Sequence, residues 1–222
     1  MQQELCNEAR NYALQRFKEE AEFIKNKGLS PMLHYRKEHT LTVVGLARNL
    51  AQQTGADQVV CEVAAWLHDL AKCYNPRLSE AENEKRQTRH GYYGAEEGRN
   101  FLRELGVEQA IIDEVYIAIE KHVGLTREFK EPLTPLSAAI TWDADKLSKI
   151  GWSAWLHFLA YTLNREKEEQ NLLELLSRDR LDVMEMISEH FNTGVARELA
   201  QKRITHYREN LAHMEGVLKG KI

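Results

Sequence analysis

One short stretch, Trp66-Leu67-His68-Asp69-Leu70-Ala71-Lys72, decides the fold of this chain. It ends an apolar segment that predicts a helix from Asp57 through Ala71, with Asp57 as the N-cap because its short carboxylate can accept a bond from a first-turn N–H. Residues at helical intervals before His68 are apolar, so the imidazole points into the core, and Asp69 follows about 100° further round the helix. A buried Asp69 carboxylate requires a cation. The apolar residues in line with His68 are Val60, Ala64 and Leu67.

The three- and four-residue spacing of apolar side chains recurs along the chain and predicts an all-α protein. Only four prolines and 12 glycines occur in 222 residues, and the glycines fall mostly between the predicted helices. Besides the helix over 57–71, we expect helices over 3–27, 32–53, 92–105, 108–122 and 135–149, then three or four amphipathic helices from Trp152, the last over 195–218. The polar stretch 73–89 is expected to be a loop or a short exposed helix, more typical of an active-site lid than of a domain linker.

Length and charge exclude several classes of protein. Residues 1–222 suffice for a single domain with a sizeable core. Lys and Arg number 30 against 34 Asp and Glu, a formal net charge of −4, which excludes the bulk basic field of nonspecific nucleic-acid binding. The three cysteines cannot form a closed disulfide framework, and no apolar stretch resembles an export signal or reaches the ~20 residues of a membrane span. These features predict a soluble, cytoplasmic protein with no membrane partner.

Two more histidines, His39 and His122, lie on apolar helix faces. A single histidine in such a place is more often a hydrogen-bonded core residue than a ligand. Three histidines and Asp69 in one core would leave several polar groups unpaired, at about 1–3 kcal/mol each, whereas a metal ion satisfies them together. The residues in line with His39 are Val43, Leu46, Ala47 and Leu50, and those in line with His122 are Ile111, Val115 and Ala118.

A further carboxylate for this core comes from the segment Trp142-Asp143-Ala144-Asp145-Lys146-Leu147. Two aspartates two positions apart on a helix point about 200° apart, so at most one is expected to face the histidines. Periodicity leaves the choice open, because Asp143 and Asp145 each align with apolar neighbours.

Three motifs occur in a fixed order along the chain: a lone His39, the pair His68-Asp69 and the late segment Asp143-Ala144-Asp145-Lys146-Leu147. In this order they resemble the HD superfamily of metal-dependent phosphohydrolases. The resemblance implies an HD-domain helical bundle with a core over about 33–151, additional N-terminal helices and a C-terminal helical extension over about 152–222.

The resemblance also implies a set of six ligands. It favours Asp145 over Asp143, since the last ligand in relatives usually follows an Ala or Val and precedes a residue such as Lys. His90, in His90-Gly91-Tyr92-Tyr93-Gly94-Ala95, resembles the HxxxGA segment of binuclear members, and His122 occupies the position of their next histidine. The absence of Gly-Tyr-Pro after His122 argues against the branch that cleaves cyclic di-GMP. The implied ligands of two ions are His39, His68, Asp69, His90, His122 and Asp145, with Asp69 as the bridge.

The implied reaction is hydrolysis of a phosphoester or phosphoanhydride of a nucleotide or related phosphorylated metabolite, by attack of a metal-bound hydroxide. Histidine and carboxylate ligands suit Mn, Fe, Co, Ni or Zn, with Mg as a further choice, and one or two ions could bind. Asp69 could accept the proton of the attacking water, while Lys72 and Lys146 are expected to contact the phosphate and to assist catalysis. Arg89, from the polar stretch, is a further candidate for substrate binding.

Two other functions fit the same residues. The six-ligand arrangement also resembles that of mixed-valent di-iron oxygenases that cleave C–C or C–P bonds. A non-catalytic protein that senses nucleotides is the other alternative, with the helices after Trp152 available to pair two subunits as a homodimer.

Overall fold

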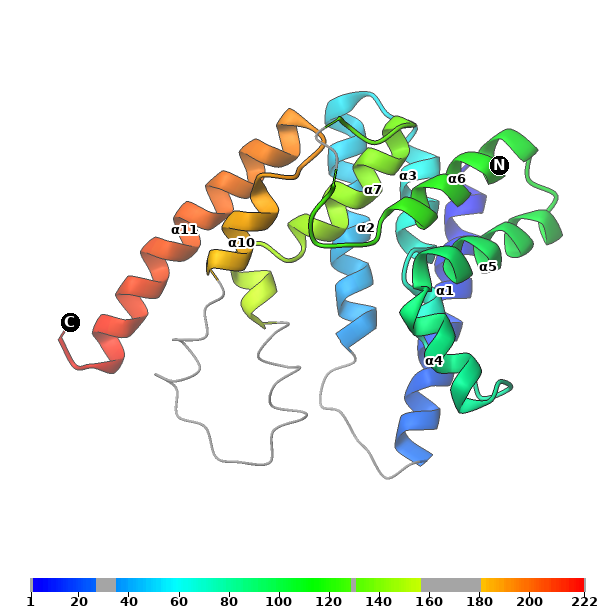
Figure 1. Cartoon of the computed structure of the whole chain (residues 1–222), viewed down its shortest axis with the longest axis horizontal. Coiled ribbons are helices and arrows are strands. Elements are labelled where there is room, and N and C mark those ends of the chain that lie inside the picture. The colour runs from blue at the N-terminus through cyan, green and yellow to red at the C-terminus, as the bar shows by residue number, and fades with distance from the viewer. Residues whose placement is uncertain (1, 27–34, 129–130, 157–180, 222) are drawn as a thin grey trace.

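The structure, a computed structural model, describes residues 2–26, 35–128, 131–156 and 181–221, and every regular element in these ranges is a helix (Figure 1). The prediction of an all-α protein is therefore confirmed. The elements are α1 (Gln2–Asn26), α2 (Tyr35–Thr54), α3 (Gln58–Leu67), the short 3-10 helix η1 (Leu70–Lys72), α4 (Glu80–Thr88), α5 (His90–Glu104), α6 (Gln109–Lys121), α7 (Leu136–Leu147), α10 (Leu181–Ser188) and α11 (Gly194–Leu218). The predicted end of the first helix at Lys27, the predicted start of the second at Met32 and much of the region after Trp152 lie outside the described residues.

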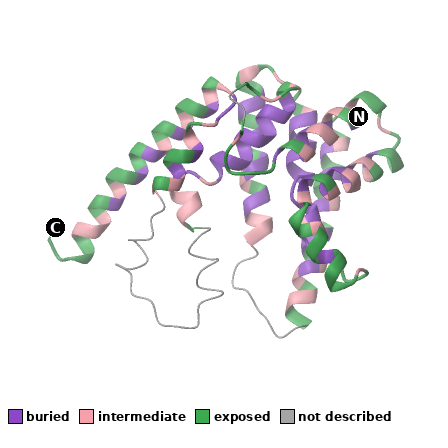
Figure 2. Ribbon diagram, in the orientation of Figure 1, coloured by how far each residue is buried: buried purple, intermediate pink, exposed green. Residues whose placement is uncertain are grey.

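Helix α3 is the centre of the bundle, in contact with α1, α2, α5, α6 and α7. Its sequence is apolar on all sides, which is typical of a helix enclosed by others, and Figure 2 shows buried residues concentrated in this region. The one charged residue in α3, Glu62, accepts two hydrogen bonds from Arg48 of α2, at 2.6 and 2.5 Å. Asp57 accepts bonds from the backbone N–H groups of Val59 and Val60 at 2.8 and 3.1 Å, so the predicted N-cap is confirmed.

The end of α3 differs from the sequence prediction. The helix stops at Leu67 instead of continuing through Ala71, and Asp69 has non-helical angles of φ −106° and ψ 8° before η1 begins. The ring of His68 takes part in this ending, because its Nδ1 bonds the backbone oxygen of Ala65 at 2.8 Å. Once the chain leaves the helix, the side chains of His68 and Asp69 are no longer held 100° apart and can reach the same point.

The polar stretch after η1 contains the short helix α4, one of the two expected forms. Ser79 and Glu82 form a capping box, in which the Ser79 N–H donates to the Glu82 carboxylate at 2.9 Å and the Glu82 N–H to Ser79 Oγ at 3.3 Å. Asn83 is buried and exchanges hydrogen bonds with the backbone of Asn75 at 2.8 and 3.0 Å. Helix α4 thereby packs against η1 and α5.

Helix α5 approaches its neighbours closely because glycines face them. A Cβ on Gly91 would lie 2.7 Å from the backbone oxygen of Glu120 in α6, and one on Gly94 would lie 3.2 Å from the backbone oxygen of His68. Such distances leave no room for a side chain at Gly91. The two glycines thus place the start of α5 beside the ends of α3 and α6.

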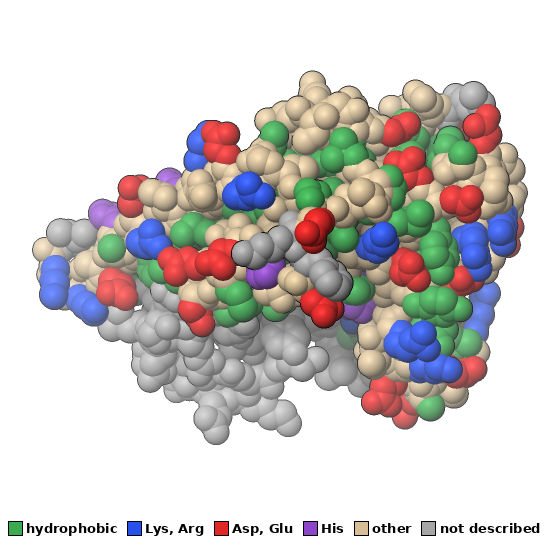
Figure 3. Space-filling model, turned by 45° about the horizontal axis from the view of Figure 1, so that its top comes forward, with side chains coloured by type: hydrophobic (Ala, Val, Ile, Leu, Met, Phe, Trp, Pro, Cys, Tyr) green, Lys and Arg blue, Asp and Glu red, His purple; other side chains and the backbone are tan. Residues whose placement is uncertain are grey.

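The C-terminal helices pack on the other side of the bundle. Helix α11 lies against α10, α7 and α2, with its N-terminal end at the bundle and its C-terminal end extending away from it (Figure 1). On the face drawn in Figure 3, acidic and basic side chains are interspersed, in keeping with the small net charge. No helix in the described ranges is long and apolar enough to cross a membrane.

Substituting Gly91 tests the close packing of α5. We expect Gly91→Ala to lower the free energy of unfolding by about 1–3 kcal/mol, because the new methyl group meets a backbone oxygen that cannot move away freely. Gly45→Ala, in the middle of α2 with open space around the new Cβ, is the control and should raise stability by about 0.5–1 kcal/mol. Urea denaturation of both variants measures the difference, and a Gly91→Ala protein as stable as the parent would contradict the packing.

Candidate metal centre

Five helical segments bring the predicted site residues together. His39 comes from α2, His68 and Asp69 from the end of α3, His90 and His122 from the start of α5 and the end of α6, and Asp145 from α7. All but His90 are between 0 % and 6 % exposed, and His90 is half-buried. The site therefore lies in the interior, with its more open side at His90.

The potential ligand atoms form two groups that share one carboxylate. Within each group, one atom from each residue lies within 4.8 Å of the others. The first group is His39, His68 and Asp69, and the second is Asp69, His90 and His122. Asp145 adjoins the first group, with its Oδ1 3.2 Å from His39 Nε2.

Each imidazole is oriented by a hydrogen bond at Nδ1. The Nδ1 atoms of His68, His90 and His122 lie 2.8, 3.1 and 2.5 Å from backbone oxygens three residues earlier in the chain. The Nδ1 of His39 lies 3.2 Å from Ser148 Oγ, whose own hydroxyl donates to the backbone oxygen of Asp145 at 2.6 Å. When Nδ1 carries the ring proton, Nε2 keeps a lone pair for a ligand.

These orientations create pairs of facing acceptors that fit a bound cation. His39 Nε2 and His68 Nε2 lie 3.3 Å apart, and His122 Nε2 lies 3.3 Å from Asp69 Oδ1. Two ring nitrogens that bind one ion tetrahedrally at about 2.05 Å would be about 3.3 Å apart. Lone pairs that face each other in a buried site need a positive charge between them, and each of the two groups contains one such pair.

Burial keeps His39, His90 and His122 neutral, as ligation requires. Desolvation is the largest cause lowering the pKa of His39, His90 and His122, each to about 4. Nearby lysines lower it further, Lys149 for His39 and Lys72 for His90.

Asp69 is the most heavily shared group of the centre. Burial by itself would raise its pKa, but the neighbouring His68 ring and Lys72, with the His122 hydrogen bond, hold that pKa well below the ordinary value. Its Oδ2 lies 3.7 Å from both His39 Nε2 and His68 Nε2, and its Oδ1 lies 2.9 Å from Lys72 Nζ. The carboxylate is therefore an anion in contact with both ligand groups.

Asp145 is bracketed by two lysines, one of which sequence reasoning missed. Lys146 Nζ bonds one carboxylate oxygen of Asp145, and Lys149 Nζ bonds the other. Although burial opposes it, the two ammonium groups hold the Asp145 pKa well below its ordinary value. Lys149, like Ser148, follows Asp145 within one helical turn, and this spacing was the only signal that could have identified it.

Asp143 lies away from the centre and ties α7 to α11. Its two oxygens accept four hydrogen bonds of 2.8 to 2.9 Å, from the backbone and side chain of both Asn192 and Thr193. Burial is the main cause raising its pKa, and these four bonds oppose the shift. The structure thus brings Asp145, and not Asp143, beside His39.

The predicted substrate contacts differ in position. Lys72 lies at the edge of the centre with 30 % of its side chain exposed. Lys146 is buried, and its Nζ also donates to the backbone oxygen of His122 at 2.8 Å. The guanidinium of Arg89, next to His90, lies over the rings of Tyr92 and Tyr93 at 5.1 and 5.9 Å.

We expect Asp143→Asn to lower the free energy of unfolding by about 2–3 kcal/mol, since the amide group would turn an NH₂ toward donors that now meet a carboxylate oxygen. Asp182→Asn makes the same chemical change at an exposed position of α10 and should have little effect. Thermal and urea unfolding of the pair test this. Equal stability of the two variants would show that the link between α7 and α11 contributes little.

Comparison with known proteins identifies the family of this fold. The HD domain model matches residues 36–150. No curated protein sequence matches the chain. Among solved structures, YpgQ from Bacillus subtilis is similar with a TM-score of 0.68 and 21 % identity over 100 % of both chains. YpgQ in complex with ADP has a TM-score of 0.57 and 20 % identity, covering 95 % of this chain and 100 % of that one.

A third similar structure is described as a predicted HD superfamily hydrolase, from an uncultured Thermotogales bacterium. Its TM-score is 0.58 at 20 % identity, covering 94 % of this chain and 92 % of that one. At such identities the solved structures show a shared fold, whereas the family model spans the segment that carries His39, His68, Asp69 and Asp145. With the His-Asp pair at the heart of a helical bundle, this chain belongs to the HD-domain family.

Proposed function

We propose that this protein is a metal-dependent phosphohydrolase that cleaves a phosphoester or phosphoanhydride bond. The observation that carries the proposal is the position of Asp69, whose carboxylate belongs to two groups of potential ligands at once. A carboxylate between two sets of imidazoles suits a pair of divalent ions, and pairs of ions commonly serve phosphoryl transfer. Burial keeps His39, His90 and His122 neutral and the neighbouring groups keep Asp69 ionised, which are the protonation states that binding of such ions needs.

In this proposal the ligands divide between two ions. His39, His68 and Asp145 would hold the first ion and His90 and His122 the second, with Asp69 shared. Ions bound there would acidify a water molecule and neutralise the phosphoryl oxygens. The choice among Mn, Fe, Co, Ni, Zn and Mg stays open, because His and carboxylate ligands accept all of them to differing degrees.

The chain's own residues would orient the substrate and move the proton. Asp69, held ionised by its neighbours, can accept the proton of the attacking water. Lys72 is close to Asp69 and partly exposed, so its ammonium can contact a phosphate oxygen. Lys146 is buried, and we assign it the role of holding Asp145 and the end of α6 in place through its two hydrogen bonds.

A nucleotide is the proposed substrate class. The similar structure of YpgQ was determined in complex with ADP, which supports a nucleotide as ligand of this fold. In this chain, Arg89 directly precedes His90 in sequence, and its guanidinium lies over the rings of Tyr92 and Tyr93. Such groups can contact phosphate or a base.

Metal content tests the ligand assignment. We expect His68→Ala and Asp69→Ala each to reduce bound metal at least about tenfold and to abolish activity, while the helical circular dichroism signal largely persists. Asp145→Asn should lose metal as well, whereas Asp143→Asn should keep it, because Asp143 bonds Asn192 and Thr193 instead.

Elemental analysis of the purified variants is the measurement, and His213→Ala, an exposed histidine of α11, is the control that should change nothing. Full metal content and activity in His68→Ala or Asp69→Ala would reject the centre. A greater metal loss in Asp143→Asn than in Asp145→Asn would reassign the ligand.

Turnover without oxygen tests the reaction class. We expect the protein to release phosphate from one or more nucleotides or related phosphorylated metabolites under anaerobic conditions, with a single kind of divalent ion added to each assay. Hydrolysis needs only water and the ions, so oxygen should not be required. Turnover that requires iron and oxygen, with a paramagnetic resonance signal of a mixed-valent pair, would instead identify an oxygenase. Protein with stoichiometric metal that cleaves no phosphate ester, diester or nucleotide would favour a nucleotide-binding role without catalysis.

A further inference from the structure

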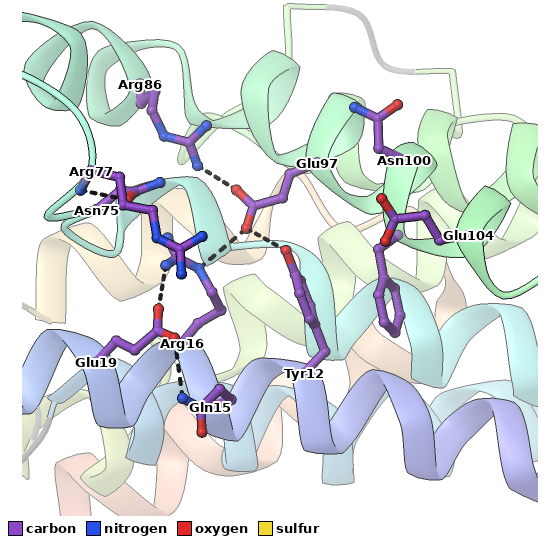
Figure 4. A pocket seen from close by; sticks show the side chains of 11 residues that line it. Tyr12, Gln15, Arg16, Glu19, Asn75, Arg77, Arg86, Glu97, Asn100 and Glu104 are labelled. Carbon is purple, nitrogen blue, oxygen red and sulfur yellow. Dashed lines mark hydrogen bonds and ion pairs between the residues drawn. The ribbon is translucent and has the colours of Figure 1, made fainter.

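A second polar pocket lies between α1, the loop after η1, α4 and α5, and it contains none of the proposed metal ligands (Figure 4). Its volume is about 410 Å³, within the range of sites for small molecules and far above the ~30 Å³ that one water occupies. Its wall includes the three arginines Arg16, Arg77 and Arg86.

The carboxylates nearest to these arginines already have several partners. Glu97 accepts hydrogen bonds or ion pairs from Tyr12 Oη at 3.1 Å, from Arg16 Nε at 3.3 Å and from Arg86 Nη2. Glu19 accepts a bond from Arg16 Nη1 at 2.9 Å. Figure 4 shows this network, in which Glu97 of α5 bonds Tyr12 and Arg16 of α1 and Arg86 of α4.

Guanidinium donors remain unused after this pairing. Arg16 Nη2 and Arg86 Nε are buried and have no acceptor among the described residues. Because both nitrogens are closed to solvent, an occupant of the pocket reaches them only after a shift of these side chains, whereas the exposed Arg77 is open to it. The Arg77 guanidinium has no hydrogen-bond or ion-pair partner in the described part of the chain. Burial raises the pKa of Glu19, but the bonds from Gln15 and Arg16 and, to a smaller extent, the charge of Arg77 lower it overall.

Unpaired buried N–H groups are costly, and guanidinium groups bond oxyanions in preference to neutral acceptors. Three glutamates, Glu19, Glu97 and Glu104, line the pocket beside the three arginines, so the formal charge of the lining is balanced. Glu104 is exposed and offers a carboxylate, while Gln15 and Asn100 offer amides. A fitting occupant therefore has an oxyanion for the arginines and hydroxyl or ammonium donors for the carboxylate.

We propose that this pocket binds a small polar molecule through a phosphate or carboxylate group, with Arg16, Arg77 and Arg86 as its donors. The occupant would join α1 to α4 and to the loop after η1, which carry these three residues. The proposal is independent of the reaction at the metal centre, because the two sites share no residue.

The test is a titration of the full-length protein with inorganic phosphate and, separately, with acetate, at an ionic strength held constant with NaCl. The measurement is the Nε–Hε cross-peak of Arg86 in a proton–nitrogen NMR correlation spectrum, which is assigned by its absence from the spectrum of Arg86→Lys. This cross-peak reports on the pocket and not on the metal centre. We expect this signal to shift until it saturates. A shift with phosphate only identifies a phosphate site, and a shift with acetate only identifies a carboxylate site.

Arg77→Gln is the decisive variant, because Arg77 is exposed and pairs with no described residue, so the fold does not depend on it. We expect this variant to weaken binding about five- to tenfold, as for loss of one charge-assisted hydrogen bond. Arg103→Gln, at an exposed position of α5 outside the pocket, is the matched control and should bind as the parent does. No shift with either anion, or equal affinity of the Arg77→Gln and parent proteins, would overturn the proposal.

Discussion

A buried carboxylate, that of Asp69, is the constraint on which the rest of the structure depends. An anion in the core is costly unless positive or hydrogen-bonding groups surround it. Here His39, His68 and His122 approach it from three helices, and Lys72 reaches it from the edge. The end of α3 at Leu67 is what makes this arrangement available, because it releases Asp69 from helical geometry immediately beside His68.

The centre is built largely from helix ends. His68 and His122 are the C-cap residues of α3 and α6, where the last backbone oxygens lack the regular helical partner four residues further on. Each ring satisfies one of these oxygens through Nδ1 and thereby presents Nε2 to the centre. His90 begins α5, which glycines allow to lie against these two ends. The same bonds that end the helices therefore also orient the potential ligands.

The metal centre and the pocket beside α1 are suited to ligands of opposite charge. In the centre, ring nitrogens and carboxylate oxygens face one another, and such acceptors are complementary to cations. In the pocket, Arg16 and Arg86 keep buried donors after their pairing with Glu97, and such donors are complementary to an oxyanion.

The sequence by itself determined the helical class, the cap at Asp57 and the inward direction of His39, His68 and His122, because helical periodicity and capping depend on nearby residues only. Periodicity could not choose between Asp143 and Asp145, since α7 is buried from Ser137 to Leu147 and has no exposed face to orient it. The HD resemblance favoured Asp145, but its placement beside His39 came from tertiary packing, in which Asn192 and Thr193 engage Asp143. The end of α3 before Ala71, the approach of Lys149 to Asp145 and the pairing of Arg86 with Glu97 were likewise decided only in three dimensions. Each depends on a backbone break or a partner that no local pattern of side chains specifies.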